Sequence, residues 1–172
     1  VDFCHERGLT EVRLGAAEEL PHANDTFDLV TALDVIEHLD DDSEGLNEIR
    51  RVLRPNGHAL LFVPAFMFLW GVQDDVSNHR RRYTRKQLLD AVTASGMEVE
   101  TISYANFTFF LPVLLVRWTM RVLKLRADTE YGINISPLNG LFAKLFAAER
   151  FVLKRAGFPF GVSLLCVARK PA

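Results

Sequence analysis

Two apolar runs of strand length, joined by one capped helix, constrain the fold of this chain more than any other feature. Residues 27–33 and 58–64 are almost continuously apolar, which is typical of strands buried on both faces of a sheet. Between them, Asp42-Ser43-Glu44 can cap a helix whose apolar positions recur every three or four residues until residues 54–57 end it. Two buried strands connected through one helix predict a parallel, right-handed βαβ unit.

The rest of the chain continues this alternation of strands and helices. A helix end is expected over residues 1–8, a short strand over 11–14, a helix with a capping box from Thr84 to Gly96, and strands over 97–104 and 160–168. The pattern predicts an α/β fold, with a mostly parallel sheet and flanking helices, in a single domain over residues 1–172. Residues 106–157 exceed what a minimal domain of this kind needs, and they are expected to form a helical insertion before the last strand.

Composition limits the class of protein. Hydrophobic residues make up 49% and charged residues 24% of the 172 residues, which excludes a disordered tail or a coiled coil. Two cysteines are too few for a disulfide scaffold, so a reducing, cytoplasmic setting is expected.

Charge is divided unevenly along the chain. Residues 1–78 carry 16 acids and 5 Lys/Arg, a net charge of 5 − 16 = −11, whereas residues 79–172 carry 6 acids and 15 Lys/Arg, a net charge of 15 − 6 = +9. The basic half can meet phosphate, an anionic membrane surface or an acidic substrate, or it can simply neutralise the acidic half within one fold.

Three segments carry polar or mixed residues directly after an apolar strand. They are residues 15–20, 34–42 and 65–83. Ligands of open α/β sheets bind beyond the carboxyl ends of the strands, where loops and helix N-termini converge. We therefore expect the cofactor and the substrate at these segments.

Three blocks in this order carry a family resemblance. They are Gly-Ala-Ala-Glu-Glu-Leu-Pro at 15–21, Phe-Asp-Leu-Val-Thr-Ala-Leu-Asp-Val-Ile-Glu-His-Leu at 27–39, and Glu-Ile-Arg-Arg-Val-Leu-Arg-Pro-Asn-Gly-His-Ala-Leu-Leu at 48–61. Together they resemble the class I S-adenosylmethionine-dependent methyltransferases, and within these the small-molecule branch that includes quinone-biosynthesis enzymes. The resemblance covers residues 1 to about 105 and implies a Rossmann-like fold, with S-adenosylmethionine as the cofactor.

The resemblance also implies which residues meet the cofactor. Ala16 and Ala17 stand at the adenine position, where the family usually has an Asp followed by a small residue, and Leu33 and Asp34 flank the methionine part of the cofactor. The family's glycine-rich first turn, and the acid that binds the ribose, occur nowhere in this sequence. We therefore expect the chain to be truncated at its N-terminus and to lack the first strands, and we expect these 172 residues alone not to build a normal cofactor pocket.

Methyl transfer needs positioning and, where the acceptor must lose a proton, a general base. His38 and His79 are the candidate bases because an imidazole titrates near neutral pH; each can instead be a structural or surface histidine. A metal site formed by His38 with Asp40, Asp41 or Asp42 is the weaker interpretation, because acids ahead of a helix more often cap it. No metal is expected.

The segment ending in His-Arg-Arg-Arg-Tyr at 79–83 also resembles a family block. Arginine presents planar donors suited to a carboxylate or a phosphate. The functional interpretation is a lid over the substrate, and the alternative is a solvated charge run before a helix. The residues expected on the substrate side are Glu37, Trp70, Asp74, Arg81, Arg82 and Tyr83.

Two stretches of the expected insertion, residues 107–125 and 137–155, suggest basic amphipathic helices. In the first, Arg117, Arg121 and Lys124 share one stripe, and apolar residues lie opposite. Such helices can lie in a membrane interface, or they can pack on the sheet or on a second subunit. Neither stretch is a convincing transmembrane helix.

The sequence therefore predicts an enzyme that, at full length, moves a methyl group from S-adenosylmethionine to a small acceptor of lipidic or anionic character. The alternative is a non-catalytic domain of the same fold that binds a membrane surface or a protein partner. No nucleic-acid partner is expected, because the basic segments lack a recognisable reader module. The acceptor, the methylated atom and the oligomeric state stay open.

Overall fold

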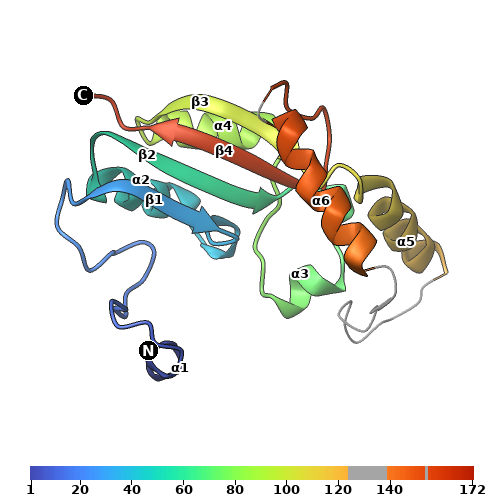
Figure 1. Cartoon of the computed structure of the whole chain (residues 1–172), viewed down its shortest axis with the longest axis horizontal. Coiled ribbons are helices and arrows are strands. Elements are labelled where there is room, and N and C mark those ends of the chain that lie inside the picture. The colour runs from blue at the N-terminus through green and yellow to red at the C-terminus, as the bar shows by residue number, and fades with distance from the viewer. Residues whose placement is uncertain (124–138, 154) are drawn as a thin grey trace.

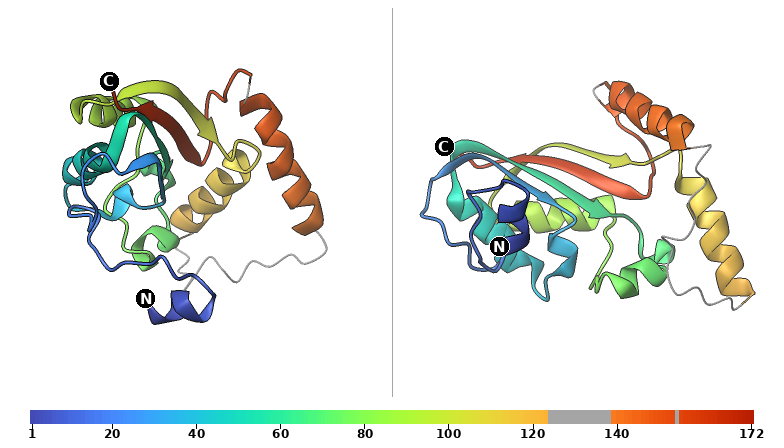
Figure 2. Two further views of the ribbon diagram at one scale, coloured as in Figure 1. Left: turned by 60° about the vertical axis from the view of Figure 1, so that its left-hand side comes forward. Right: turned by 60° about the horizontal axis from the view of Figure 1, so that its bottom comes forward.

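The computed structural model describes residues 1–123, 139–153 and 155–172. Four strands form one sheet in the order β1-β2-β4-β3, and helices α2 and α4 lie side by side on one of its faces (Figures 1 and 2). The strands are β1 (Phe27–Leu33), β2 (Leu53–Pro64), β3 (Glu98–Ala105) and β4 (Ser163–Arg169). The helices are α1 (Asp2–Glu6), α2 (Asp42–Val52), α3 (Val72–Val76), α4 (Arg85–Ala94), α5 (Phe110–Val122) and α6 (Asn139–Leu153), with single 3₁₀ turns η1 (Ile36–His38) and η2 (Met67–Leu69).

The predicted βαβ arrangement is present. β1 pairs in parallel with β2, and α2 connects them. Asp41 rather than Asp42 caps α2, because its carboxylate accepts a hydrogen bond from the backbone N–H of Ser43 at 2.9 Å. The helix ends at Val52, just before the expected stop at residues 54–57, and these residues belong to β2, which begins at Leu53.

The direction of β4 makes the sheet mixed. β4 is antiparallel to both β2 and β3, so β1, β2 and β3 run one way and β4 runs the other way between two of them. The sheet is therefore mostly parallel by strand direction, although two of its three pairings are antiparallel. Direction depends on how the connection before a strand returns, which hydrophobic periodicity does not encode.

The core lies between the sheet and the two helices. Leu46 of α2, Leu61 of β2, Leu88 of α4 and Leu164 of β4 are all 0% exposed. The expected helix from Thr84 is confirmed, since Thr84 and Gln87 form a capping box at the start of α4.

One expected element is wrong. Residues 11–14 form no strand, and Leu14 is 86% exposed. A short apolar run needs a neighbouring strand to satisfy its backbone groups, and in the described part of the chain the nearest β-pairing is the isolated bridge between Ala16 and Glu19. The strands expected over 97–104 and 160–168 are present with shifted ends, as β3 and β4.

Helices α5 and α6 come between β3 and β4 in the chain and lie at the end of the sheet where β2 and β3 finish (Figure 1). Parts of the stretches 107–125 and 137–155 lie outside the described residues, including Lys124. Within the described residues, no helix has both the length and the apolar character needed to cross a bilayer.

Candidate active site

The site begins where β1 ends. Asp34 follows the last residue of β1 and has a φ of +52°, a left-handed conformation that is uncommon for residues other than glycine. The turn η1 then carries Glu37 and His38. Glu37 is 0% exposed, and neither of its carboxylate oxygens has a hydrogen-bond partner among the described residues.

A second segment is held beside this turn by backbone hydrogen bonds. The N–H of Tyr83 donates to the carbonyl of Pro64 at 2.9 Å, and the N–H of Phe66 donates back to Tyr83, so the segment runs alongside the end of β2. The N–H of Arg80 donates to the carbonyl of Glu37 at 2.8 Å. These bonds bring His79 beside the turn η1, although Glu37 of that turn lies 42 residues earlier in the chain.

Two carboxyl groups and two imidazoles meet at this place. The rings of His38 and His79 lie edge to face with centroids 4.7 Å apart, and one ligand atom from each of Glu37, His38 and His79 lies within 4.8 Å of the others. The groups are therefore close enough to share a proton, a water molecule or a cation. We call Asp34, Glu37, His38 and His79 the acid–imidazole cluster.

Burial changes the protonation of both acids of the cluster. Desolvation, reinforced by the nearby charge of Asp34, raises the pKa of Glu37 to about 7. Desolvation also raises the pKa of Asp34, although His79, Glu37 and His38 oppose the change. A carboxyl group that titrates near neutral pH, as Glu37 does, is typical of sites that handle protons.

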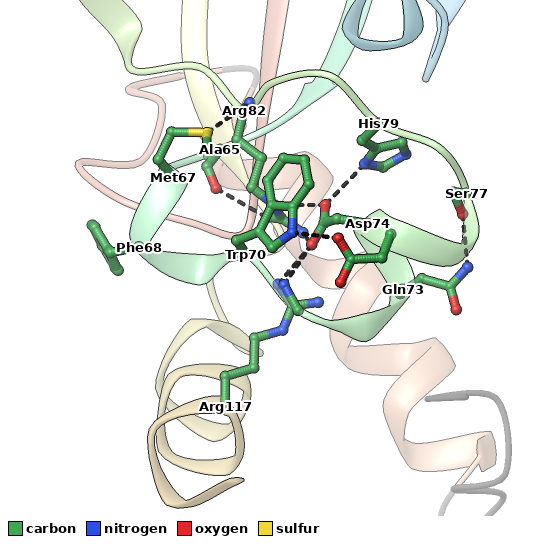
Figure 3. Close-up of polar contacts among 12 residues, drawn as sticks. Ala65, Met67, Phe68, Trp70, Gln73, Asp74, Ser77, His79, Arg82 and Arg117 are labelled. Atoms are coloured by element: carbon green, nitrogen blue, oxygen red, sulfur yellow. Dashed lines mark hydrogen bonds and ion pairs between the residues drawn. The ribbon is translucent and has the colours of Figure 1, made fainter. Parts of the chain in front are cut away.

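Asp74 forms a second centre next to the cluster (Figure 3). Asp74 is 0% exposed. It accepts two hydrogen bonds from Arg82, at 2.7 and 2.9 Å, and one from the N–H of Gly71 at 2.7 Å. His79 Nδ1 lies 2.8 Å from the same carboxylate. Arg117 of α5 approaches it at 3.6 Å. Burial alone would raise the pKa of Asp74, but the hydrogen bonds from Arg82, Gly71 and His79 outweigh it and hold the pKa below its ordinary value.

The other residues predicted on the substrate side form hydrogen bonds and ion pairs with other groups of the protein. Arg81 donates to the carbonyls of Leu39 and Asp40 at 2.9 and 2.7 Å and pairs with Asp42. The Tyr83 hydroxyl donates to Asp42 at 2.6 Å, and burial together with this hydrogen bond raises its pKa. Trp70 donates to Asp75 at 2.9 Å and lines an open pocket of about 280 Å³ between α3 and α5.

The residues expected at the cofactor lie in two places. Ala16 and Ala17 belong to a turn that is tied to α2 by a hydrogen bond from the N–H of Leu20 to Glu48 at 2.9 Å. Leu33, at the end of β1, is 53% exposed, and Asp34 belongs to the acid–imidazole cluster.

Arg117 is the residue of this site that the sequence analysis did not assign to it. It was expected on the basic stripe of an amphipathic helix, yet its side chain is 10% exposed and lies against Asp74. A cation inside an apolar run is a usable signal, because a buried charge needs a partner. The pattern does not say which acid, 43 residues earlier in the chain, is that partner.

Parts of the chain are similar to known methyltransferases. Residues 2–61 match the family described as the methyltransferase domain. The chain is 35% identical over 82 residues to the uncharacterized methyltransferase YcgJ of Bacillus subtilis, covering 46% of this chain and 32% of that protein. It is 34% identical over 92 residues to a protein of Mycolicibacterium smegmatis described as a probable S-adenosylmethionine-dependent methyltransferase, covering 52% and 36%. The chain thus spans about a third of the length of these curated relatives.

A solved structure shares the fold. The S-adenosylmethionine-dependent methyltransferase of Thermotoga maritima, described as a possible histamine N-methyltransferase, superposes with a TM-score of 0.58 at 16% identity, covering 98% of this chain and 68% of that one. The predicted α/β, Rossmann-like fold is thereby confirmed. Over residues 2–61, the chain is similar to the methyltransferase domain family.

Proposed function

We propose that the chain forms the acceptor side of an enzyme that transfers a methyl group from S-adenosylmethionine to a small, lipidic or anionic acceptor. The observation that carries this proposal is the acid–imidazole cluster, built by the segments that follow β1 and β2. It lies at the carboxyl ends of the strands, where α/β sheets bind ligands, and β1 falls within the stretch that matches methyltransferase domains. The relative described as S-adenosylmethionine-dependent supports this choice of methyl donor.

Within this proposal, the cofactor side is formed by Leu33 and Asp34 at the methionine part and by Ala16 and Ala17 at the adenine. β1 is an edge strand of the described sheet, and its Leu29 and Leu33 are more than half exposed. An apolar strand edge is a place where further strands pair. We propose that strands carrying a glycine-rich turn complete the donor pocket at this edge.

Calorimetric titration with S-adenosylmethionine tests both the choice of methyl donor and the proposal that further strands complete its pocket. We compare the 172-residue chain with an extended chain that also carries the proposed strands and their glycine-rich turn. We expect micromolar binding by the extended chain only, weakened at least tenfold by Asp34→Ala and unchanged by Asp28→Ala, an exposed residue of the same strand. Micromolar binding by the 172 residues alone would contradict the incomplete pocket. If neither version binds S-adenosylmethionine, the proposal that it is the methyl donor would be contradicted.

A second candidate function rests on the surface of α5. Leu111, Leu115, Trp118 and Val122 of this helix are 56–60% exposed, while Arg117 is buried against Asp74. We propose that these apolar side chains insert into an anionic membrane surface, from which a lipidic acceptor would reach the site. As a non-catalytic alternative, the same contact would be the whole function of the chain.

Sedimentation with vesicles of phosphatidylglycerol and phosphatidylcholine tests membrane contact. We expect the chain to pellet at low salt, and Trp118→Ser to lower the bound fraction several-fold, because burying a large apolar side chain contributes roughly 2 kcal/mol. Leu14→Ser is the control, since Leu14 is exposed far from α5 in the sequence. Absence of pelleting at low salt would exclude the membrane surface as a partner.

A further inference from the structure

The contacts of Asp74 indicate a role different from substrate binding. Its two oxygens are occupied by the guanidinium of Arg82, the N–H of Gly71 and the imidazole of His79, and it has no exposed surface. A carboxylate enclosed in this way cannot reach a substrate. It can act only through the side chains that it holds.

The contact with His79 fixes the state of that imidazole. An ionised carboxylate only accepts hydrogen bonds, and the donors around Asp74 hold it in the ionised form. His79 Nδ1, 2.8 Å from Asp74, must therefore carry a proton. In a neutral imidazole, the other nitrogen, Nε2, then has the free lone pair.

The surroundings of His79 explain why Nε2 matters. The ring packs against His38 and lies within 4.8 Å of Glu37, and Asp34 is close enough for its charge to interact with His79. His79 is 13% exposed, so the ring is held but not sealed from ligands. The charged groups around it are Asp74 and Arg82 on one side and Asp34, Glu37 and His38 on the other.

We infer that Asp74 is a positioning residue that holds His79 as the Nδ1–H tautomer, and that His79 Nε2 takes the proton of the methyl acceptor. This inference rests on the proposed function and deepens it, because it selects acceptors whose methylated oxygen or nitrogen carries a hydrogen. A lone pair of that atom forms a bond to the methyl carbon, the carbon–sulfur bond of the donor breaks with its electron pair going to sulfur, and the acceptor's proton moves to Nε2. His38 then has a packing role.

The tautomer of His79 can be measured without any substrate. In long-range ¹H–¹⁵N NMR spectra of the ¹⁵N-labelled chain at pH 8, we expect His79 to show a protonated Nδ1 and an unprotonated Nε2. His79→Gln assigns the signals, and His38→Gln is the matched control that should leave the His79 pattern unchanged. A protonated Nε2 in the wild-type chain would overturn the inference.

Asp74→Asn tests the positioning role. Its amide can present N–H₂ to the imidazole, so we expect His79 to lose the pure Nδ1–H pattern, as the wrong tautomer would form. An unchanged pattern in a folded Asp74→Asn variant would overturn the role of Asp74. If that variant does not fold, the wild-type spectrum still decides the tautomer. Binding of S-adenosylmethionine is measured separately by calorimetry. A negative calorimetric result would contradict the proposed function and would leave the tautomer of His79 to be decided by NMR.

Discussion

The carboxyl group of Glu37 is 0% exposed and has no hydrogen-bond partner in the described part of the chain. Its pKa rises from 4.5 to about 7 on folding, so between these pH values the folded protein binds a proton that the unfolded chain has released. The free energy of unfolding therefore falls as pH increases from about 4.5 to about 7. The full effect is up to about 3 kcal/mol.

Glu37→Gln removes this titration. We expect the free energy of unfolding of the variant, measured with urea, to depend less on pH between 5 and 8 than that of the wild-type chain, because a side-chain amide binds no proton in this range. Glu44→Gln, on the exposed side of α2, should keep the wild-type slope. Equal slopes for Glu37→Gln and the wild-type chain would show that Glu37 is already ionised in the folded protein at pH 5.

The two cysteines should differ in reactivity. Cys166 is 0% exposed in β4, and burial raises its pKa to about 12, whereas Cys4 is partly exposed in α1. Because the thiolate is the reactive form, we expect a disulfide reagent to label one thiol per native chain and two in urea. Cys4→Ser should abolish native labelling, and rapid labelling of that variant would contradict the burial of Cys166.

The capping box of α4 gives a measurable contribution of one helix terminus. Thr84→Ala removes the side-chain acceptor of the Gln87 N–H, and we expect it to lower the free energy of unfolding by about 1 kcal/mol. Thr93→Ala, at an exposed position inside the same helix, is the matched control and should stay within about 0.5 kcal/mol of the wild type. Equal effects of both substitutions would show that the capping box does not stabilise α4.

Helix α5 shows how one buried carboxylate can draw a basic residue toward the protein. Arg117 and Arg121 were predicted to share a stripe; Arg117 lies against Asp74, while the exposed Arg121 donates to the carbonyls of Phe68 and Trp70. Leu111, Leu115, Trp118 and Val122 are exposed. Periodicity predicted the stripe, and it did not predict that Arg117 lies against Asp74.

The contact between Arg117 and Asp74 joins α5 to the rest of the protein. We expect Arg117→Ala to increase amide hydrogen exchange in α5 at least tenfold, with exchange in β2 and β4 unchanged, because the helix would open locally. Arg121→Ala should have a smaller effect, since its hydrogen bonds are long, at 3.3 and 3.4 Å. Unchanged exchange in Arg117→Ala would show that other contacts hold α5.

Local sequence patterns predicted most of the elements and the resemblance to methyltransferases. Continuous apolar runs, a capping box and polar residues after each strand are local patterns, and local chemistry is sufficient to specify them. The sequence also identified Asp34, Glu37, His38, His79 and Asp74 as candidates, since polar residues after buried strands gather at one edge of a sheet.

How those candidates contact one another depends on the three-dimensional fold. It placed His79 beside Glu37, enclosed Asp74 between Arg82 and Arg117, reversed β4, and left residues 11–14 without a strand. Each of these outcomes depends on partners far apart in the chain. Such partners are chosen by which buried polar groups can satisfy one another in three dimensions, and no local pattern carries that information.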